Sequence, residues 1–152
     1  MICIRPMLEA DLAAVLRIEQ ACFFRAWTSE HFLAEIGSER GTPVVVELDG
    51  RVAGYLCLTV LLDEAEILDV AVDPALQGRG IGAQLVQWAC DEAIQRGARL
   101  LLLEVRATSQ PAIALYERFG FQQTGLRKAY YEDNIDAVLM DKKLMKEDVD
   151  AV

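Results

Sequence analysis

The feature that most constrains the fold is a glycine-rich loop between an expected strand and an expected helix. The strand ends at Val72, glycines follow at positions 78, 80 and 82, and an apolar pattern of helical period runs from Gly82 to Arg96. Glycines let successive backbone N–H groups point into one concavity, and a helix N-terminus adds a partial positive charge. The segment therefore predicts an anion cradle, most often for phosphate, within an α/β domain.

Two other types of phosphate-binding loop compete for this interpretation. A P-loop ends in Gly-Lys-Ser/Thr, which this loop lacks. A dinucleotide fingerprint has the spacing Gly-x-Gly-x-x-Gly/Ala, which Gly78, Gly80 and Ala83 satisfy, and Glu104 supplies an acidic residue at the end of the next strand. Against it, Asp73–Gln77 separate the strand from the glycines, and the chain upstream reads as a hairpin meander rather than repeated βαβ units.

The remaining segments predict one mixed α/β domain over residues 1–145, followed by a polar tail over 146–152. Asp49-Gly50 between two apolar runs predicts a hairpin, and the nearly pure apolar run Leu100–Val105 predicts a strand covered on both faces. The expected strands are Ile2–Pro6, Pro43–Leu48, Val52–Leu62, Glu66–Val72, Leu100–Val105, Gln122–Tyr131 and Ala137–Leu144. The expected helices are Glu9–Cys22, Thr28–Ile36, Gly82–Arg96 and Pro111–Phe119.

Composition excludes several classes of protein. With 152 residues, 53% hydrophobic and 26% charged, the chain is neither disordered nor a small disulfide scaffold. No apolar run reaches the ~18 residues of a membrane span. A net charge of −9 argues against nucleic-acid binding. Four scattered cysteines and one histidine predict no metal site, and their free thiols, with no signal sequence at the start, predict a cytoplasmic protein.

Gln77-x-x-Gly80-x-Gly82, after a strand and before a long helix, resembles the acetyl-CoA loop of the Gcn5-related N-acetyltransferase superfamily. The resemblance extends over almost the whole chain and implies a single domain with a central, mostly antiparallel mixed sheet flanked by helices. Within the superfamily, the sequence resembles the bacterial ribosomal-protein-alanine N-acetyltransferases. The segments that carry this narrower resemblance are Ile67–Gly82, Leu103–Ala107, Ala112–Phe121 and Tyr130-Tyr131.

The resemblance implies that acetyl-CoA is the co-substrate. Backbone groups of Val70, Ala71 and Val72 would line its acetyl and pantetheine arm, much as an added strand pairs with a sheet edge. Its pyrophosphate would lie on Gly78, Arg79, Gly80, Ile81, Gly82 and Ala83, although Arg79 is equally an ordinary exposed arginine. Ser109 stands where the subfamily has a cofactor-contacting asparagine, and it is equally a candidate helix cap.

Two side chains are implied to move protons. Glu104, after four leucines, is either an ion-pair partner of Arg106 or a general base for the substrate ammonium, and the resemblance favours the base. Tyr116 is either a core aromatic near Phe119 and Phe121 or the general acid that protonates the departing thiolate, again as the resemblance implies.

The aromatic residues Phe24, Trp27 and Tyr131 are implied to frame the acceptor, although Phe24 and Trp27 alternatively form a hydrophobic staple beside the second helix. The expected reaction is direct acetyl transfer to a protein N-terminal α-amine, with the N-terminal alanine of a small-subunit ribosomal protein as the implied acceptor. Lysine side chains, polyamines and small-molecule amines are alternative acceptors. A CoA-binding regulatory module without turnover is the alternative outside enzymes.

Overall fold

The computed structural model describes residues 2–131 and 133–144, so the predicted tail over 146–152 lies outside the described residues. The described chain forms two compact units. The first unit comprises residues up to 59 together with 67–85, and the second comprises 60–66 and the residues from 86 onward. Two strands and one helix have residues in both units.

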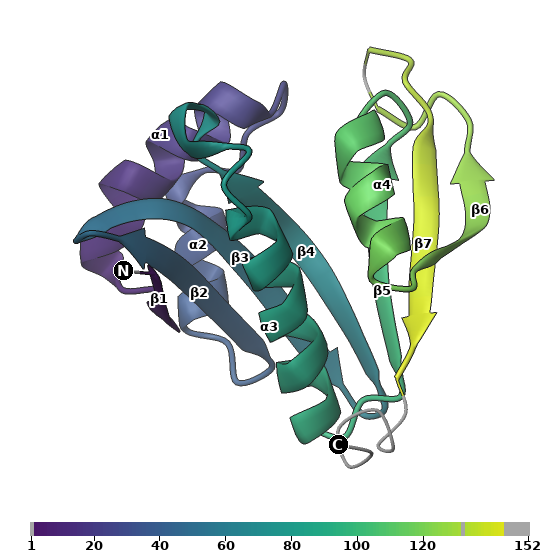
Figure 1. Cartoon of the computed structure of the whole chain (residues 1–152), viewed down its shortest axis with the longest axis horizontal. Coiled ribbons are helices and arrows are strands. Elements are labelled where there is room, and N and C mark those ends of the chain that lie inside the picture. Colours follow the sequence, from purple (N-terminus) through teal and green to yellow (C-terminus); the bar gives the residue numbers. More distant parts are fainter. Residues whose placement is uncertain (1, 132, 145–152) are drawn as a thin grey trace. The chain divides into compact units, whose positions relative to one another are not determined.

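The elements follow the order expected from the sequence. The strands are β1 (Ile2–Pro6), β2 (Gly41–Leu48), β3 (Arg51–Leu61), β4 (Glu64–Val72), β5 (Leu100–Arg106), β6 (Gln122–Arg127) and β7 (Ala137–Lys143). The helices are α1 (Leu12–Cys22), α2 (Ser29–Ile36), α3 (Ile81–Gln95) and α4 (Gln110–Arg118), with short 3-10 turns η1 (Glu9–Asp11) and η2 (Pro74–Leu76) (Figure 1). The strand order is β1-β2-β3-β4-β5-β7-β6, and β4 with β5 is a parallel pair.

The core of the first unit lies between the helices α1 and α2 and one face of β2, β3 and β4. Period-2 alternation turns Val45, Tyr55 and Ala71 toward the helices. Helical periodicity turns the apolar stripe of α1 and α2 toward the strands. The buried members of this cluster are Met7, Leu12, Val15, Ile18, Phe32, Val45, Tyr55, Cys57 and Ala71.

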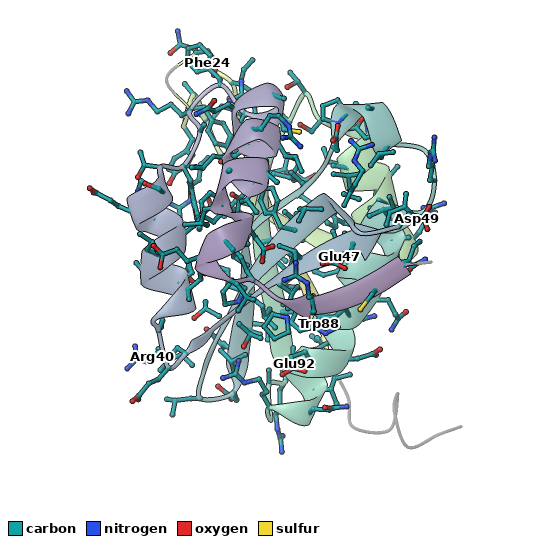
Figure 2. The ribbon with its side chains drawn as sticks, turned by 90° about the vertical axis from the view of Figure 1, so that its left-hand side faces the viewer. Phe24, Arg40, Glu47, Asp49, Trp88 and Glu92 are labelled. Atoms are coloured by element: carbon teal, nitrogen blue, oxygen red, sulfur yellow. The ribbon has the colours of Figure 1, made fainter. Side chains whose placement is uncertain are left out.

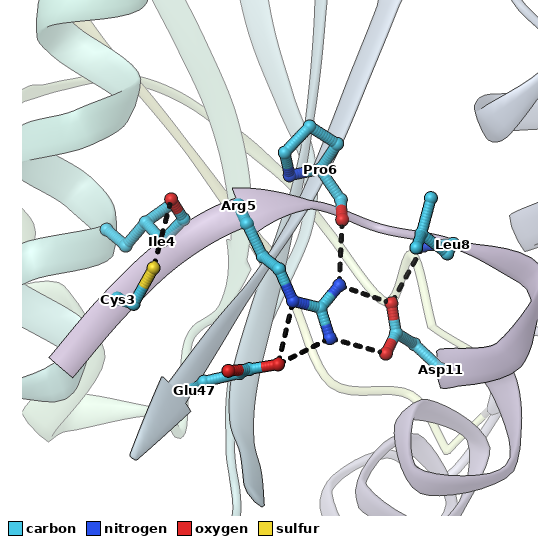
Figure 3. A network of polar contacts seen from close by, with 7 residues as sticks. All are labelled: Cys3, Ile4, Arg5, Pro6, Leu8, Asp11 and Glu47. Carbon is cyan, nitrogen blue, oxygen red and sulfur yellow. Dashed lines mark hydrogen bonds and ion pairs between the residues drawn. The ribbon is translucent and has the colours of Figure 1, made fainter. Parts of the chain in front are cut away.

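A charged network joins β1, β2 and η1 at the start of α1 (Figure 3). The Arg5 guanidinium donates to both oxygens of Asp11 at 2.8 Å, and its Nε donates to Glu47 Oε1 at 2.8 Å. These donors lower the pKa of the Asp11 carboxyl, which also accepts the Leu8 N–H. Bidentate pairing of this kind fixes geometry, so it anchors the first turn of α1 to the strands.

An irregularity in the β2–β3 pairing shapes the end of β4. Val46 pairs with Gly54 but Glu47 pairs with Val52, so Ala53 is an extra residue on β3. The Ala53 carbonyl accepts the Asp73 N–H at 2.8 Å. The bulge therefore holds the chain where β4 ends and the glycine-rich loop begins.

In the second unit β5 pairs with β7, and β7 pairs with β6, both antiparallel. One face of β5 is buried through Leu101, Leu103 and Val105, whereas Glu104 on the opposite face is exposed. The sequence predicted a strand covered on both faces, and that prediction is wrong. The predicted strand Gln122–Tyr131 is too long. It ends at Arg127, because the chain turns at Ala129 (φ 49°), whose N–H donates to Asp136 Oδ1 at 2.8 Å.

Across the part of the chain that the structure describes, no helix is both long enough and apolar enough to cross a membrane.

Candidate active site

The predicted cofactor segment, Val70–Ala83, lies in the first unit. Beyond β4, the Asp73 side chain accepts the Ala75 N–H at 3.0 Å and so shapes the η2 turn. The Gln77 side-chain amide then donates back to the Val72 carbonyl at 3.2 Å. These bonds explain why five residues separate the strand from the first glycine, since they build the bend that carries the chain from strand to helix.

The glycines give the loop its open shape. Gly78 and Gly80 have φ of 83° and 81°, and a Cβ at either position would meet no atom within 4 Å. α3 begins at Ile81, which is 1% exposed and anchors the helix start, while the Gln84 N–H closes the first turn on the Gly80 carbonyl at 3.2 Å. The N–H groups at the start of a helix have no partner within it. The loop and helix start thus fit an anion such as the pyrophosphate of CoA.

The segment Phe23–Thr28, here called the acceptor segment, joins α1 to α2. Phe24 is 72% exposed at this turn and points away from the ribbon (Figure 2). Trp27 instead packs on Phe32, with ring centroids 5.1 Å apart, and precedes the N-cap Thr28. That pairing is the hydrophobic staple predicted as an alternative for Trp27, and it sets the angle at which the chain enters α2.

Glu104 lies in the second unit on the exposed face of β5. Its carboxylate is 3.7 Å from Arg127 Nε on β6. The predicted partner Arg106 instead pairs with Asp133, and its guanidinium lies 4.8 Å from the ring centroid of Tyr131. The ion pair with Arg106, which the sequence offered as the alternative to a general base, does not form: positions 104 and 106 lie on the same face of β5, but Arg106 finds its partners in the turn after β6.

Charges gather around Glu104. Glu66 of β4 pairs with Leu102, and two residues further on the same face is Glu104. Burial raises the pKa of Glu66, and the Glu104 charge raises it further. Burial and the Glu104 charge likewise raise the pKa of the Tyr131 hydroxyl. Glu104 and Tyr131, which the sequence treated separately, thus share one electrostatic environment, together with the guanidinium groups of Arg127 and Arg106.

The helix α4 carries the other two predicted side chains of the second unit. Tyr116 is 6% exposed and packs edge-on against Phe121, with ring centroids 5.7 Å apart. Its ring is therefore part of the core, whatever its hydroxyl does. Ser109 is at the N-cap position, where its carbonyl accepts the Ile113 N–H at 3.0 Å, but its side chain makes no capping hydrogen bond. Pro111 stands in the first turn as predicted.

Comparison with known proteins shows which family the chain belongs to. The model of the acetyltransferase (GNAT) family matches residues 12–121. The chain belongs to the GNAT acetyltransferase family. The matched range includes residues of both units, so the two units are parts of one acetyltransferase domain. The predicted fold class, with a mixed sheet and flanking helices, is confirmed.

Two kinds of relative support the assignment. The [ribosomal protein bS18]-alanine N-acetyltransferase of Salmonella typhimurium is 39% identical over 133 residues, which cover 86% of this chain and 89% of the relative. The crystal structure of the ribosomal-protein-S18-alanine N-acetyltransferase from Escherichia coli has a TM-score of 0.88 at 35% identity, covering 95% of this chain and 94% of that one. Ard1 from Thermoplasma volcanium has a TM-score of 0.87 at 26% identity, covering 95% and 98%.

Family membership confirms that this chain is an acetyltransferase with acetyl-CoA as its acetyl donor, and it excludes the dinucleotide interpretation of the loop. Three residues that matter to the site escaped the sequence analysis. Arg127 and Glu66 reach Glu104 through strand pairings that no local pattern reveals. Gly54 could have been found from the sequence, because a lone glycine inside an apolar strand often marks a bulge or a close approach of two backbones.

Proposed function

We propose that this acetyltransferase transfers the acetyl group of acetyl-CoA to a protein N-terminal α-amine, and that its acceptor is the N-terminal alanine of ribosomal protein bS18. The observation that carries the proposal is the 39% identity, over nearly the full length of both chains, to a relative named for that acceptor. A relative in Escherichia coli with the same name is 38% identical over 133 residues.

The charges of the chain agree with such an acceptor. Ribosomal proteins bind RNA and are generally basic, whereas this chain carries a net charge of −9. Around Glu104, the neighbouring carboxylate of Glu66 adds to the negative potential that would attract an N-terminal ammonium. We assign Tyr131, Phe24 and Trp27 to the acceptor chain. Exposure of Phe24 and the half-buried position of Tyr131 leave both able to contact an extended peptide.

For the chemistry, we assign Glu104 as the general base. An α-amine has a pKa of about 8, so at neutral pH most of it is protonated and must lose one proton before it attacks. Glu104 accepts that proton, directly or through a water molecule. Its exposed position on β5 suits a group that must exchange protons with solvent in each cycle.

The remaining steps fall to the cofactor segment and α4. Backbone groups of Val70, Ala71 and Val72 hold the acetyl and pantetheine arm, and a backbone N–H of this strand stabilises the oxyanion. The pyrophosphate lies on Gly78–Ala83, with Arg79 as an added cation and Ser109 as a further contact. Tyr116 donates its hydroxyl proton to the departing thiolate, because a thiolate is a better leaving group once protonated.

A competing function keeps the family and changes the acceptor to a lysine side chain, a polyamine or a small amine. Incubating the enzyme with acetyl-CoA and a mixed peptide library, with the products located by mass spectrometry, separates these cases. Acetylation at α-amines of peptides that begin with alanine supports the proposal. Products on lysine or on free amines only would reject it. The proposed acceptor is synthesised in the cytoplasm, which we therefore propose as the location of the enzyme.

A further inference from the structure

Besides Asp11, which pairs with Arg5, two carboxyl groups are buried in the first unit, and the proposed mechanism uses neither of them. Glu19 on α1 is 1% exposed and Asp69 on β4 is 9% exposed. Asp69 Oδ2 is fully buried and, among the residues described, has no hydrogen-bond partner. An ionised carboxylate in such a position is strongly unfavourable, so the state of this oxygen needs an explanation.

Donors surround Glu19 but leave Asp69 short of one. The Tyr55 hydroxyl donates to Glu19 Oε1, and the Trp27 backbone N–H donates to Glu19 Oε2 at 2.9 Å. Both Glu19 oxygens therefore act as acceptors, which is the pattern of an ionised carboxylate. Asp69 lies next to the Glu19 carboxylate. If both groups were ionised, neither could donate a hydrogen bond to the other. A proton on Asp69 supplies the missing donor and reduces the pair to one negative charge.

The surroundings favour that proton. Burial, followed by hydrogen bonding to Glu19, raises the pKa of Asp69 to about 9. The other titratable groups that act on the pair or on its neighbours come from α1, α2, β3 and the loop after β4, and none of them is cationic: Cys22, Glu35, Tyr55, Cys57 and Asp73. Burial raises the pKa of the Tyr55 hydroxyl and of both thiols, so these three groups are neutral in the range where Asp69 holds its proton.

We propose that Glu19 is a positioning residue for the acceptor segment, and that it does this work only while Asp69 holds the proton that the two carboxyl groups share. The Glu19 side chain holds the backbone of Trp27, and its own carbonyl accepts the Phe23 N–H at 3.0 Å, so one residue fixes both ends of the turn that displays Phe24. The inference rests on the proposed function in one respect, namely that Phe24 and Trp27 contact the acceptor.

Loss of the shared proton to solvent places two negative charges side by side in a buried site. Their repulsion separates α1 from β4, and the Trp27 N–H then loses its acceptor. The acceptor segment is therefore released as the pH rises past the pKa of Asp69. Asp69→Asn removes this response, because the amide still donates to Glu19 and cannot ionise.

The first test follows the segment without any acceptor. The chain has two tryptophans, so Trp88→Phe on α3 leaves Trp27 as the only tryptophan and reports the segment by its fluorescence. In this parent enzyme we expect an alkaline transition in the emission spectrum, centred near the pKa of Asp69. Adding Asp69→Asn is expected to abolish it. A transition that persists in the Asp69→Asn enzyme, or a parent enzyme without one, would overturn the proposal.

The second test is kinetic and separates KM from kcat. Glu19→Gln is expected to raise the KM of an alanine-first peptide by about tenfold, the change that one lost charge-assisted hydrogen bond corresponds to, with a smaller effect on kcat. Glu30→Gln, the same chemical change at an exposed position of α2, is the matched control and is expected to leave the KM unchanged. An unchanged KM in Glu19→Gln would refute the positioning role.

The two tests fail in distinguishable ways. If Glu19→Gln does not fold, the fluorescence transition and the pH dependence of KM in Asp69→Asn decide whether the proposal holds. If the transition follows Asp69 but the enzyme acetylates no α-amine, the shared proton is established and the proposed acceptor is wrong. If α-amines are acetylated and the transition is absent, the proposed function stands and this inference is wrong.

Discussion

The carbonyl oxygen of Ala71 on β4 lies only 2.7 Å from the point that a Cβ on Gly54 of β3 would occupy. Glycine at position 54 therefore lets β3 approach the strand that we assign to the acetyl and pantetheine arm. We expect Gly54→Ala to displace β4 near Ala71, because the atom that it meets is backbone and cannot rotate away. Overpacking of this kind costs about 1–3 kcal/mol of stability.

The measurement for Gly54→Ala is calorimetric titration with acetyl-CoA together with thermal unfolding. The dissociation constant should rise about tenfold or more, in proportion to the displaced backbone. Gly37→Ala is the matched control, because its Cβ would meet nothing closer than 3.5 Å. Equal affinities in the two variants would show that the end of β4 does not hold the cofactor.

Glu104→Gln should lower turnover about 10²–10⁴-fold at neutral pH if Glu104 removes a proton in the reaction. Raising the pH should partly restore the rate, because the free-amine fraction of the acceptor grows as the pH passes the pKa of the α-amine. The pH profile of kcat/KM measures both effects.

Arg127→Gln separates the catalytic role of Glu104 from its ion pair. The two side chains are partly exposed, and such pairs contribute about 0–1 kcal/mol. Arg127→Gln should therefore change the rate far less than Glu104→Gln. Comparable losses in the two variants would mean that Glu104 acts as a structural partner of Arg127 and not as a base.

Tyr116→Phe keeps the ring that packs on Phe121 and removes only the hydroxyl. We expect little change in melting temperature, a loss of turnover on the order of 10²-fold or more, and no rescue at high pH, since the lost group is a donor. Thermal unfolding and a pH series of kcat report these quantities. Turnover close to that of the unmodified enzyme would leave Tyr116 as a core aromatic only.

Much of this fold follows from the sequence. The order and type of the strands and helices came from apolar periodicity, and the hairpin came from the dipeptide Asp49-Gly50. The missing features depend on partners distant in the chain. The β6 strand ends at Arg127 because Asp136, beyond the turn, accepts the Ala129 N–H. The Glu19–Asp69 contact joins residues 50 positions apart, so no local pattern reveals it.

The protonation of Asp69 also predicts how the stability of the protein depends on pH. The folded protein holds a proton on Asp69 up to about pH 9, whereas in the unfolded chain this carboxyl ionises near its ordinary pKa of 3.8. Over the window between these values the folded state binds more protons than the unfolded state, so the free energy of unfolding falls as the pH rises. The stabilisation is complete below the lower value and is lost by the upper one.

Asp69→Asn removes this dependence, because the amide does not ionise in either state. We expect the variant to melt at a higher temperature than the unmodified protein at pH 8, and the two curves of melting temperature against pH to converge toward pH 4. Asp63→Asn at an exposed turn is the control, with a curve parallel to that of the unmodified protein. Parallel curves for Asp69→Asn would show that Asp69 is ionised in the folded state.

The most direct test of the central claim, that this enzyme acetylates a protein N-terminal α-amine, is one competition assay. A peptide that begins with alanine and a lysine-containing peptide with a blocked N-terminus are presented together with acetyl-CoA, and fragmentation mass spectrometry locates the modified nitrogen. We predict that nearly all acetyl groups appear on the alanine α-amine, and that the rate falls with added salt because an acidic enzyme attracts a basic peptide. Acetylation mainly on the lysine side chain would contradict the proposed acceptor while leaving the family and the cofactor in place.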